Sequence, residues 1–379
     1  MLDFVRESLA FFPRETGPKQ VRFARSKTTR NMSNSHFDRM RRFAARLRQP
    51  RRLVNWLRAR KERQERPDRL RSLPVGIDLE PTTRCNLRCL ACQHSEGNWP
   101  GEDLPVERFG RLLDQLPYLE QIKLQGVGEP LLHEQFFELV RRAKRHGIWV
   151  SSITNGTTLH LEKHRSEILG SRLDEMMVSI DGATAETHAH WRGGSDLDRI
   201  VSGLGRLVEL RGRATAPRLG IWCVGNPDNL RELPALVELA AAIGVDELTY
   251  QTEMASWGRE EWRKRLAAFR ISRGTTEAAQ YLKEARDEAL RRRFPLTIYT
   301  GNRFSAERPC FWPWESCFVS AGGSVTRCCV ASDPRLHNFG RIDDSDFPGM
   351  WNSGDYQTLR RTIRDNNIPP ICRACYGLE

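Results

Sequence analysis

The sequence EPTTRCNLRCLAC at residues 80–92 decides the fold, because it places Cys85, Cys89 and Cys92 within eight residues. It begins at the end of an apolar segment, residues 75–80, that we expect to be a strand. Loops that follow the carboxyl ends of parallel strands carry the chemistry of α/β folds. Three thiolates on such a loop can ligate three irons of a cubane cluster and leave the fourth iron open for reaction. The spacing therefore predicts a reactive iron–sulfur site.

The overall composition predicts a folded, soluble chain. Of the 379 residues, 39% are hydrophobic and 28% are charged, which is enough apolar material for a large core and for two or three domains. No apolar run approaches the roughly 18–20 residues of a membrane span. The amino-terminal residues carry acids among apolar residues and lack a small-residue cleavage site, which argues against a secretory signal. We therefore expect a cytoplasmic protein.

The net charge of +12 is concentrated near the amino terminus. Residues 1–75 contain 21 Lys and Arg against 7 Asp and Glu, a net charge of +14, so the remaining residues carry −2. A body this close to neutral gives no charge argument for nucleic-acid binding. We therefore expect no nucleic-acid partner.

The basic residues gather in an arm with helical spacing. Between residues 39 and 61 there are ten bases and no acid, and apolar residues recur at helical intervals up to the break at Pro50. Such a helix could lie on an anionic membrane surface, which would make the protein peripheral on the inner face. The other interpretation is that its apolar face packs on the body while the arginines are solvated. Residues 37–61 are thus a candidate membrane-binding segment.

From residue 75 onward, short apolar strands alternate with amphipathic helices such as residues 134–145 and 228–242. The predicted strands are residues 75–80, 121–125, 149–154, 176–180, 219–224 and 247–251. Six such units in series imply a parallel sheet with right-handed crossovers. Either an open sheet or a curved partial barrel satisfies this count.

In the remaining third of the chain the regular alternation of strands and helices ends. Residues 259–294 are predicted to be helical, and residues 296–300 read as a further strand. A hairpin is predicted at residues 316–320 and 325–330, around the glycine-containing turn 321–324. A small second domain with its own cysteines is therefore expected at the carboxyl end.

The spacing of the three cysteines resembles that of the radical S-adenosylmethionine (SAM) superfamily. The resemblance runs from residue 75 to the carboxyl end, and it implies a partial (βα)6 barrel, in agreement with the six strand–helix units. It also implies a [4Fe-4S] cluster whose open iron binds SAM and cleaves it reductively to a 5′-deoxyadenosyl radical. The electron would come from a flavodoxin- or ferredoxin-type reductant.

Further motifs of the family follow in the expected order. Residues 126–130, Gly-Val-Gly-Glu-Pro, resemble the stretch that binds the SAM amino group, because glycines permit close approach and a carboxylate accepts from an ammonium. Residues 154–155 match the ribose contacts. Ser179, Asp181 and Arg192 match a Ser-x-Asp…Arg pattern in which the serine contacts SAM and the arginine holds its carboxylate. The predicted cofactor-binding residues are Gly126, Gly128, Glu129, Pro130, Thr154, Asn155, Ser179, Asp181 and Arg192.

One position departs from the family pattern. An aromatic residue usually precedes the third cysteine and packs near the adenine, whereas this chain has Ala91 there. Gln93 or His94 would then have to supply adenine contacts.

Six of the ten cysteines lie in the last seventy residues. Cys310, Cys328, Cys372 and Cys375 complete a second four-thiolate site, which resembles the SPASM/twitch extension with one auxiliary [4Fe-4S] cluster. Four thiolates with a CxxC pair also suit tetrahedral zinc, although the cysteine triplet upstream favours iron and sulfur. Two [4Fe-4S] clusters and SAM are therefore the expected cofactors.

The other cysteines have less defined roles. Cys328 and Cys329 are adjacent, and adjacent strand residues point to opposite faces, so only one of them can face the cluster. Cys317 is either a core residue or a reserve ligand. Cys223 lies in a predicted strand, where a buried apolar role is expected.

These observations predict an α/β chain of three parts. Residues 1–74 form a basic helical extension, residues 75–300 a radical SAM partial TIM-like barrel, and residues 301–379 a small α+β iron–sulfur domain of the SPASM/twitch type. The favoured function is an oxidoreductase of the dehydrogenase or epimerase type, because the tail resembles that of radical SAM dehydrogenases acting on 2-deoxy-scyllo-inosamine. Its substrate would be a sugar or cyclitol.

Two other functions stay open. A ribosomal-peptide maturase would use the same radical to form thioether or C–C crosslinks or to epimerise a residue. A zinc-stabilised scaffold with a membrane-binding arm would leave the glycine and Ser-x-Asp motifs unexplained. For the acid–base step of an enzyme, the candidates are Tyr250 and Glu253, near the end of the sixth strand, and His133, all expected at the barrel mouth.

Overall fold

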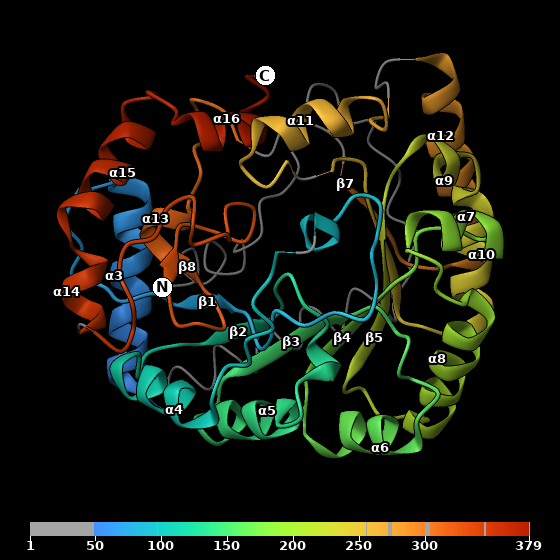
Figure 1. Ribbon diagram of the computed structural model, residues 1–379, viewed down its shortest axis with the longest axis horizontal. Coiled ribbons are helices and arrows are strands. Elements are labelled where there is room, and N and C mark those ends of the chain that lie inside the picture. The colour runs from blue at the N-terminus through green and yellow to red at the C-terminus, as the bar shows by residue number, and fades with distance from the viewer. Residues whose placement is uncertain are drawn as a thin grey trace, which may run out of the picture. The chain divides into compact units, whose positions relative to one another are not determined.

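The computed structural model describes residues 49–96, 98–254, 256–271, 275–299, 304–344 and 346–378 (Figure 1). The chain divides into two compact units, Met1–Leu53 and Val54–Glu379. Helix α3 (Pro50–Glu65) begins in the first unit, of which only residues 49–53 are described. Residues 1–48, which include residues 37–48 of the basic arm, therefore lie outside the described residues, and the fold that follows is that of the second unit.

A nine-stranded sheet organises the second unit, in the order β7-β6-β5-β4-β3-β2-β1-β8-β9. Every neighbouring pair is parallel except β8 with β9. The strands are β1 (Gly76–Leu79), β2 (Gln121–Leu124), β3 (Trp149–Thr154), β4 (Glu175–Ser179), β5 (Arg218–Val224), β6 (Glu247–Gln251), β7 (Leu296–Tyr299), β8 (Ser316–Val319) and β9 (Val325–Thr326). The first six agree with the predicted strands to within one residue at each end, which confirms the α/β barrel architecture.

Helices connect the parallel strands and cover the outer face of the sheet (Figure 1). They are α4 (Val106–Gln115), α5 (Phe136–Arg145), α6 (Glu162–Gly170), α7 (Ala185–Trp191), α8 (Leu197–Arg211), α9 (Pro227–Arg231), α10 (Leu233–Ile243) and α12 (Thr276–Arg292). Helix α11 (Glu260–Ala267) lies apart from them, near α16 in Figure 1, and packs Trp262 and Leu266 in a separate apolar cluster. The helix predicted at residues 228–242 is in fact two helices, α9 and α10. Pro234 lacks an N–H and lies in the first turn of α10, so one continuous helix cannot form there.

The side chains of the strands alternate between an apolar outer face and a more polar inner face. Ile77, Leu79, Ile122 and Leu124 are buried in the core between the sheet and its helices. The intervening positions face the inside of the curved sheet, and they include Asp78, Lys123, Ser179, Trp222, Thr249 and Gln251. The barrel interior is therefore lined by groups that can contact a polar ligand.

The carboxyl-terminal hairpin continues the barrel sheet. Strand β8 pairs in parallel with β1, from Gly76 opposite Ser316 to Leu79 opposite Val319. The turn that follows places Gly323 at φ +87°, a conformation that favours glycine. The predicted strand 325–330 is wrong in length, because pairing ends at Thr326 and the chain leaves the sheet before the cysteine pair.

The tail also contains short helices that wrap against the start of the unit. These are α13 (Trp312–Glu315), α14 (Phe347–Trp351), α15 (Gly354–Arg364) and α16 (Arg373–Tyr376). The fully buried Arg360 donates to the carbonyl oxygens of Pro313 at 2.8 Å, Asp68 at 3.0 Å and Trp351 at 2.6 Å. Burial lowers the pKa of this guanidinium to about 10. Residues 54–74 are thus fastened to the tail, and the predicted boundaries at 74 and 300 stay predictions.

The described end of the basic arm presents mixed faces. Trp56 and Ala59 are buried, whereas Val54 and Leu57 are exposed. Both side-chain atoms of Asn55 bond to the backbone of Leu73, at 3.0 and 2.9 Å. The tryptophan face is therefore taken up by packing, and membrane binding by residues 37–61 stays a prediction.

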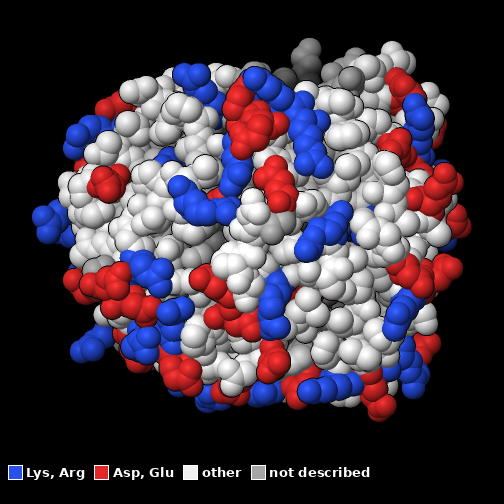
Figure 2. Space-filling view, viewed as in Figure 1, with Lys and Arg blue, Asp and Glu red and all other residues white. Residues whose placement is uncertain are grey.

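No helix within the described residues combines the length and the apolar character that a membrane span requires. On the face shown in Figure 2, Lys and Arg side chains are interspersed with Asp and Glu, and no broad area of one sign appears. This agrees with the nearly neutral body that the sequence indicates.

Candidate active site

The three cysteines lie on the loop after β1, at the carboxyl edge of the sheet where the sequence predicts them. Cys85, Cys89 and Cys92 are half-buried, and the charge of Cys89 contributes to raising the pKa of both Cys85 and Cys92. Burial, the larger cause, raises the pKa of Cys92 to about 12. The amide of Cys92 donates to the carbonyl of Cys89 at 3.1 Å, which folds the loop into a tight turn. The loop thus gathers three soft ligands in one place.

Two predicted residues bring nitrogen donors to these thiols. Arg192 lies with Nη1 3.7 Å from Cys89 Sγ and with Nε 3.2 Å from the Asp181 carboxylate. The side-chain nitrogen of Asn155, Nδ2, is 4.0 Å from Cys85 Sγ. Cationic and N–H groups beside sulfur stabilise thiolates. The loop therefore fits an anionic iron–sulfur cluster.

The glycine-rich stretch packs directly against the segment that leads into the triplet. A Cβ on Gly126 would lie 2.3 Å from the Glu80 side chain, and one on Gly128 would lie 2.2 Å from the Thr82 carbonyl oxygen. The amide of Glu129 donates to the Arg84 carbonyl at 2.8 Å. These glycines are needed for contact between two loops, a role that the sequence alone does not reveal.

The Glu129 carboxylate is occupied by partners within the protein. It accepts from Thr154 Oγ1 at 2.6 Å, from the backbone N–H of Asn155 at 2.6 Å and from the backbone N–H of Leu131 at 3.1 Å. The last of these hydrogen bonds caps the short turn η2 (Pro130–Leu132). Burial raises the pKa of this carboxyl group, while the three hydrogen bonds oppose the rise. Glu129 therefore joins the ends of β2 and β3 and orients Asn155 toward the cysteines.

Glu80 is a buried carboxyl group that the sequence analysis did not single out. One oxygen accepts from the Val127 amide at 2.8 Å, and the other accepts from the Ala321 amide at 3.2 Å. Burial raises its pKa to about 7. Glu80 thus ties the end of β1 both to the glycine-rich stretch and to the turn of the carboxyl-terminal hairpin.

Two of the acid–base candidates are not at the barrel mouth, so their predicted placement is wrong. Tyr250 is fully buried in the core, where its hydroxyl donates to Asn229 Oδ1 at 2.9 Å. The error is one of strand parity, because the outer face of β6 carries Tyr250 and the inner face carries Gln251. His133 is buried with Nε2 2.9 Å from the Leu104 carbonyl oxygen, and its Nδ1 accepts from the Gln135 amide at 3.0 Å. Glu253 is half-buried after β6, and its role stays a prediction.

The four predicted tail cysteines lie close enough for their charges to interact, although no three His, Cys, Asp or Glu side chains of the described residues are arranged to hold a single metal ion. The charges of Cys328, Cys372 and Cys375 each raise the pKa of the Cys310 thiol, which is raised most by burial. Arg327 Nη1 lies 3.9 Å from Cys372 Sγ, so this second group of thiols also has a cation beside it. The donor set again fits a cluster with thiolate ligands.

The other cysteines lie elsewhere. The Cys329 thiol hydrogen-bonds to the carboxyl group of Asp78 on β1. Cys317 is fully buried in the core on β8, and Cys223 is buried on β5 beside the Asn229 amide at 3.3 Å. Of the adjacent pair, Cys328 is therefore the one that joins the tail group.

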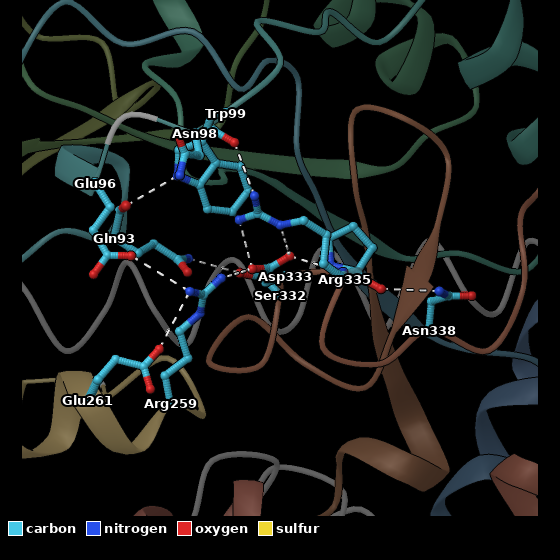
Figure 3. Close-up of polar contacts among 11 residues, drawn as sticks. Gln93, Glu96, Asn98, Trp99, Arg259, Glu261, Ser332, Asp333, Arg335 and Asn338 are labelled. Atoms are coloured by element: carbon cyan, nitrogen blue, oxygen red, sulfur yellow. Dashed lines mark hydrogen bonds and ion pairs between the residues drawn. The ribbon is translucent and has the colours of Figure 1, made fainter.

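A buried ionic network connects the loop after the triplet to the tail (Figure 3). The Asp333 side chain has no exposed surface, and it pairs with Arg259, just before α11, and with Arg335 at 2.9 Å. The Arg335 guanidinium lies 4.6 Å from the centre of the Trp99 ring, and Arg259 lies 3.6 Å from Glu96 in the short turn η1 (Gln93–Glu96). No local spacing in the sequence signals this network, because the contacts that join its segments link residues 74 (Arg259 to Asp333) and 237 (Asn98 to Arg335) positions apart.

The two residues expected near the adenine belong to the same region. His94 has Nε2 3.1 Å from the Thr83 carbonyl oxygen and Nδ1 3.0 Å from Arg88, so both ring nitrogens have protein partners. Gln93 donates to Ser332 Oγ at 3.4 Å, and its own buried oxygen has no hydrogen-bond partner among the described residues. Gln93 therefore keeps an acceptor free, whereas His94 does not.

Comparison with known proteins agrees with this geometry. The family model described as the radical SAM superfamily matches residues 79–240, and that described as an iron–sulfur cluster-binding domain, SPASM, matches residues 310–376. The chain belongs to the radical SAM superfamily. These domains bind SAM, a [4Fe-4S] cluster and auxiliary iron–sulfur clusters, so the predicted cofactors are confirmed and the chain is a radical SAM enzyme.

Several radical SAM relatives cover most of the chain. It is 26% identical to the AdoMet-dependent heme synthase of Methanosarcina barkeri, over 80% of this chain and 88% of that protein. It is 26% identical to the PqqA peptide cyclase of Ruegeria pomeroyi, over 82% of each. A third relative, the tungsten-containing aldehyde ferredoxin oxidoreductase cofactor-modifying protein of Pyrococcus furiosus, is 31% identical over 45% of this chain, which spans only about half of that protein (49%).

The fold has a solved counterpart. The structure of Streptococcus suis SuiB bound to its precursor peptide SuiA superimposes with a TM-score of 0.62, covering 96% of this chain and 77% of that one. At 13% identity this likeness concerns the fold alone. It shows that the fold described above also occurs in a solved structure.

Replacing Glu80 by Gln should flatten the pH dependence of stability. A carboxyl group with a folded pKa of about 7 keeps its proton in the folded state after the unfolded chain has released it, so the free energy of unfolding falls as the pH rises from about 5 to 8. The contribution is at most about 3 kcal/mol. Urea midpoints across this range measure it. Exposed Glu186→Gln on α7 is the control, and an unchanged slope in Glu80→Gln would contradict the assignment.

Replacing Asp333 by Asn should loosen the link between the triplet loop and the tail. The amide removes the carboxylate partner of Arg259, whose side chain is 17% exposed, and of the more exposed Arg335, which should lower the free energy of unfolding by about 2 kcal/mol. Amide hydrogen exchange should rise in residues 93–99 and 332–338. The exposed Asp344→Asn in the same tail should change neither quantity. Equal exchange in wild type and Asp333→Asn would show that the network is not what couples the two segments.

Proposed function

We propose that this radical SAM enzyme modifies a peptide by abstracting a hydrogen atom, as a ribosomal-peptide maturase. The observation that carries the proposal is the similarity to a PqqA peptide cyclase over 82% of both chains. It favours the peptide alternative over the sugar or cyclitol substrate that the tail spacing suggests. The edge strand β7 adds support, because Thr297 and Tyr299 are exposed on its interior face, where an extended chain could contact them.

In this proposal, Cys85, Cys89 and Cys92 hold the SAM-binding cluster, and Cys310, Cys328, Cys372 and Cys375 hold one auxiliary cluster. When bound, the first cluster supplies the electron that cleaves SAM to the 5′-deoxyadenosyl radical. The four thiolates of the tail would leave no open position on the second cluster. The two sites thus divide the work between radical formation and electron transfer.

The protein's own groups orient and charge-balance the first site. Arg192 offers a guanidinium beside Cys89, with Asp181 fixing its direction, and the free donors of Arg192 suit the SAM carboxylate. Glu129 holds Asn155 in place for a ribose contact and, in this geometry, acts on SAM through that residue. Ser179, at the end of β4, faces the interior and completes the predicted set.

Cysteine variants test the division of work. After anaerobic reconstitution the wild type should hold about eight irons per chain, and Cys85/Cys89/Cys92→Ala should hold about four and produce no 5′-deoxyadenosine with SAM and dithionite. Cys372/Cys375→Ala should also lose about half of the iron but still cleave SAM, without modifying substrate. Circular dichroism and gel filtration check that the tail has not simply unfolded. Continued 5′-deoxyadenosine formation by the triple variant would refute the central assignment.

Host extracts test the substrate class. Peptide substrates should stimulate 5′-deoxyadenosine formation above the uncoupled rate, and protease treatment of the extract should abolish the stimulation. The peptide recovered from the untreated reaction should show the mass loss of a dehydrogenative crosslink or deuterium exchange at an epimerised centre. Stimulation that survives protease and resides in the low-molecular-weight fraction would instead support the sugar or cyclitol substrate.

A further inference from the structure

Lys123 is a charged residue inside the barrel that the proposed SAM site does not use. On β2 it lies between Ile122 and Leu124, both fully buried in the core under the outer helices. Because successive side chains of a strand point to opposite faces, Lys123 faces the interior. A cation is thus placed inside the barrel.

The contact that Lys123 makes shows how far it reaches. Its Nζ lies 5.1 Å from the centre of the Trp222 ring on β5. Strand β5 is three strands away from β2, roughly 14 Å along a flat sheet, so the contact crosses the hollow of the curved sheet. The Trp222 ring is in turn 6.2 Å from that of Tyr299, whose side chain is 54% exposed on the end strand. The ammonium therefore lies over an aromatic wall that reaches the open edge of the sheet.

The Lys123 ammonium donates no hydrogen bond to any of the residues that the structure describes. An ammonium has three donors, and an aromatic ring face satisfies them only weakly. Lys123 is half-buried, so its N–H donors can bond to water in the free protein. An anionic ligand would accept stronger, charge-assisted hydrogen bonds from the same donors.

The nearest carboxyl group does not neutralise Lys123 by contact. Asp78 is its partner in the register of β1 with β2, yet the Asp78 oxygens are engaged by the Gln125 amide at 2.8 Å and by the Cys329 thiol. Burial raises the pKa of Asp78, and the charge of Lys123 opposes that rise. Asp78 and Lys123 therefore interact through their charges, without a hydrogen bond between them.

The other carboxylates of the interior face are bound at the opposite end of the barrel. Arg218 lies 2.9 Å from Glu247 and 3.8 Å from Glu175, near the amino ends of their strands. These three groups form a closed ionic layer. Lys123 makes no such contact ion pair with any of the described residues, and Asp78 acts on it only through its charge.

We propose that Lys123 binds a carboxylate of the substrate, and that the substrate peptide carries an acidic side chain that enters the barrel. The inference rests on the proposed peptide function and names the side-chain class that the barrel selects. The carboxylate would accept hydrogen bonds from Nζ, while the methylene groups of the acidic side chain pack on Trp222. The aromatic wall and the ammonium together suit a Glu or Asp side chain better than a neutral polar one.

Small blocked amino acids test this without requiring turnover. The probes are N-acetyl-glutamate N-methylamide and its glutamine counterpart, titrated calorimetrically into the anaerobically reconstituted full chain. The wild type should bind the glutamate probe about tenfold more tightly than the glutamine probe, as a charge-assisted hydrogen bond predicts. Lys123→Met should remove the preference, and Lys123→Arg, which keeps the charge, should retain most of it.

Matched measurements separate the outcomes. Exposed Lys283→Met on α12 is the control for loss of a surface charge. SAM affinity is measured in parallel, and a loss of SAM affinity in Lys123→Met with no change in probe preference would assign the ammonium to the SAM carboxylate and overturn the proposal. Equal binding of the two probes by the wild type, or no detectable binding of either, would overturn it as well. If the glutamate preference holds while extract stimulation survives protease, the peptide function fails but Lys123 still selects an acidic small molecule.

Discussion

The site depends most on the two hydrogen bonds that the buried Glu80 carboxyl group accepts. It joins the end of β1 to the glycine-rich stretch through Val127 and to the carboxyl-terminal hairpin through Ala321. The cysteine triplet begins five residues later, so its position is set by the same anchor. A carboxyl group is suited to this because its two oxygens accept from two separate backbone amides at once. Burial raises its pKa, which shows that fixing the three loops costs desolvation.

The curvature of the sheet decides what the interior can do. The helices pack on the apolar outer face of the parallel strands, and the inner face is left for polar side chains. Because the sheet is curved, Lys123 and Trp222 meet although their strands are three apart. The substrate space is therefore defined by residues from opposite sides of the barrel. The proposed choice of an acidic side chain follows from that juxtaposition.

The tail is built into the barrel at two places. Strand β8 pairs with β1, and the Asp333 network binds the tail loop to the turn after the third cysteine (Figure 3). Both links are buried, so each resists separation of the two cysteine groups. A fixed relation between the groups is what electron transfer between a substrate and a second cluster would require.

The sequence by itself determined the class of chemistry and the architecture. Cysteine spacing depends on a few adjacent residues, and the alternation of apolar strands with amphipathic helices is a local periodicity, so both could be read directly. The resemblance to the radical SAM family, not the periodicity, located Asn155, Asp181 and Arg192, which the structure brings to the triplet.

Only the tertiary structure decided which face each side chain occupies and which distant segments meet. The prediction assigned Tyr250 to the wrong face of its strand, and in the structure it lies in the core instead of at the barrel mouth. His133 follows a short turn, and both of its ring nitrogens have protein partners. The pairing of β8 with β1, the occupied carboxylate of Glu129, the Asp333 network and the reach of Lys123 all join residues that no spacing rule connects. Their contacts arise from the closing of the sheet, and that closure is a property of the whole chain.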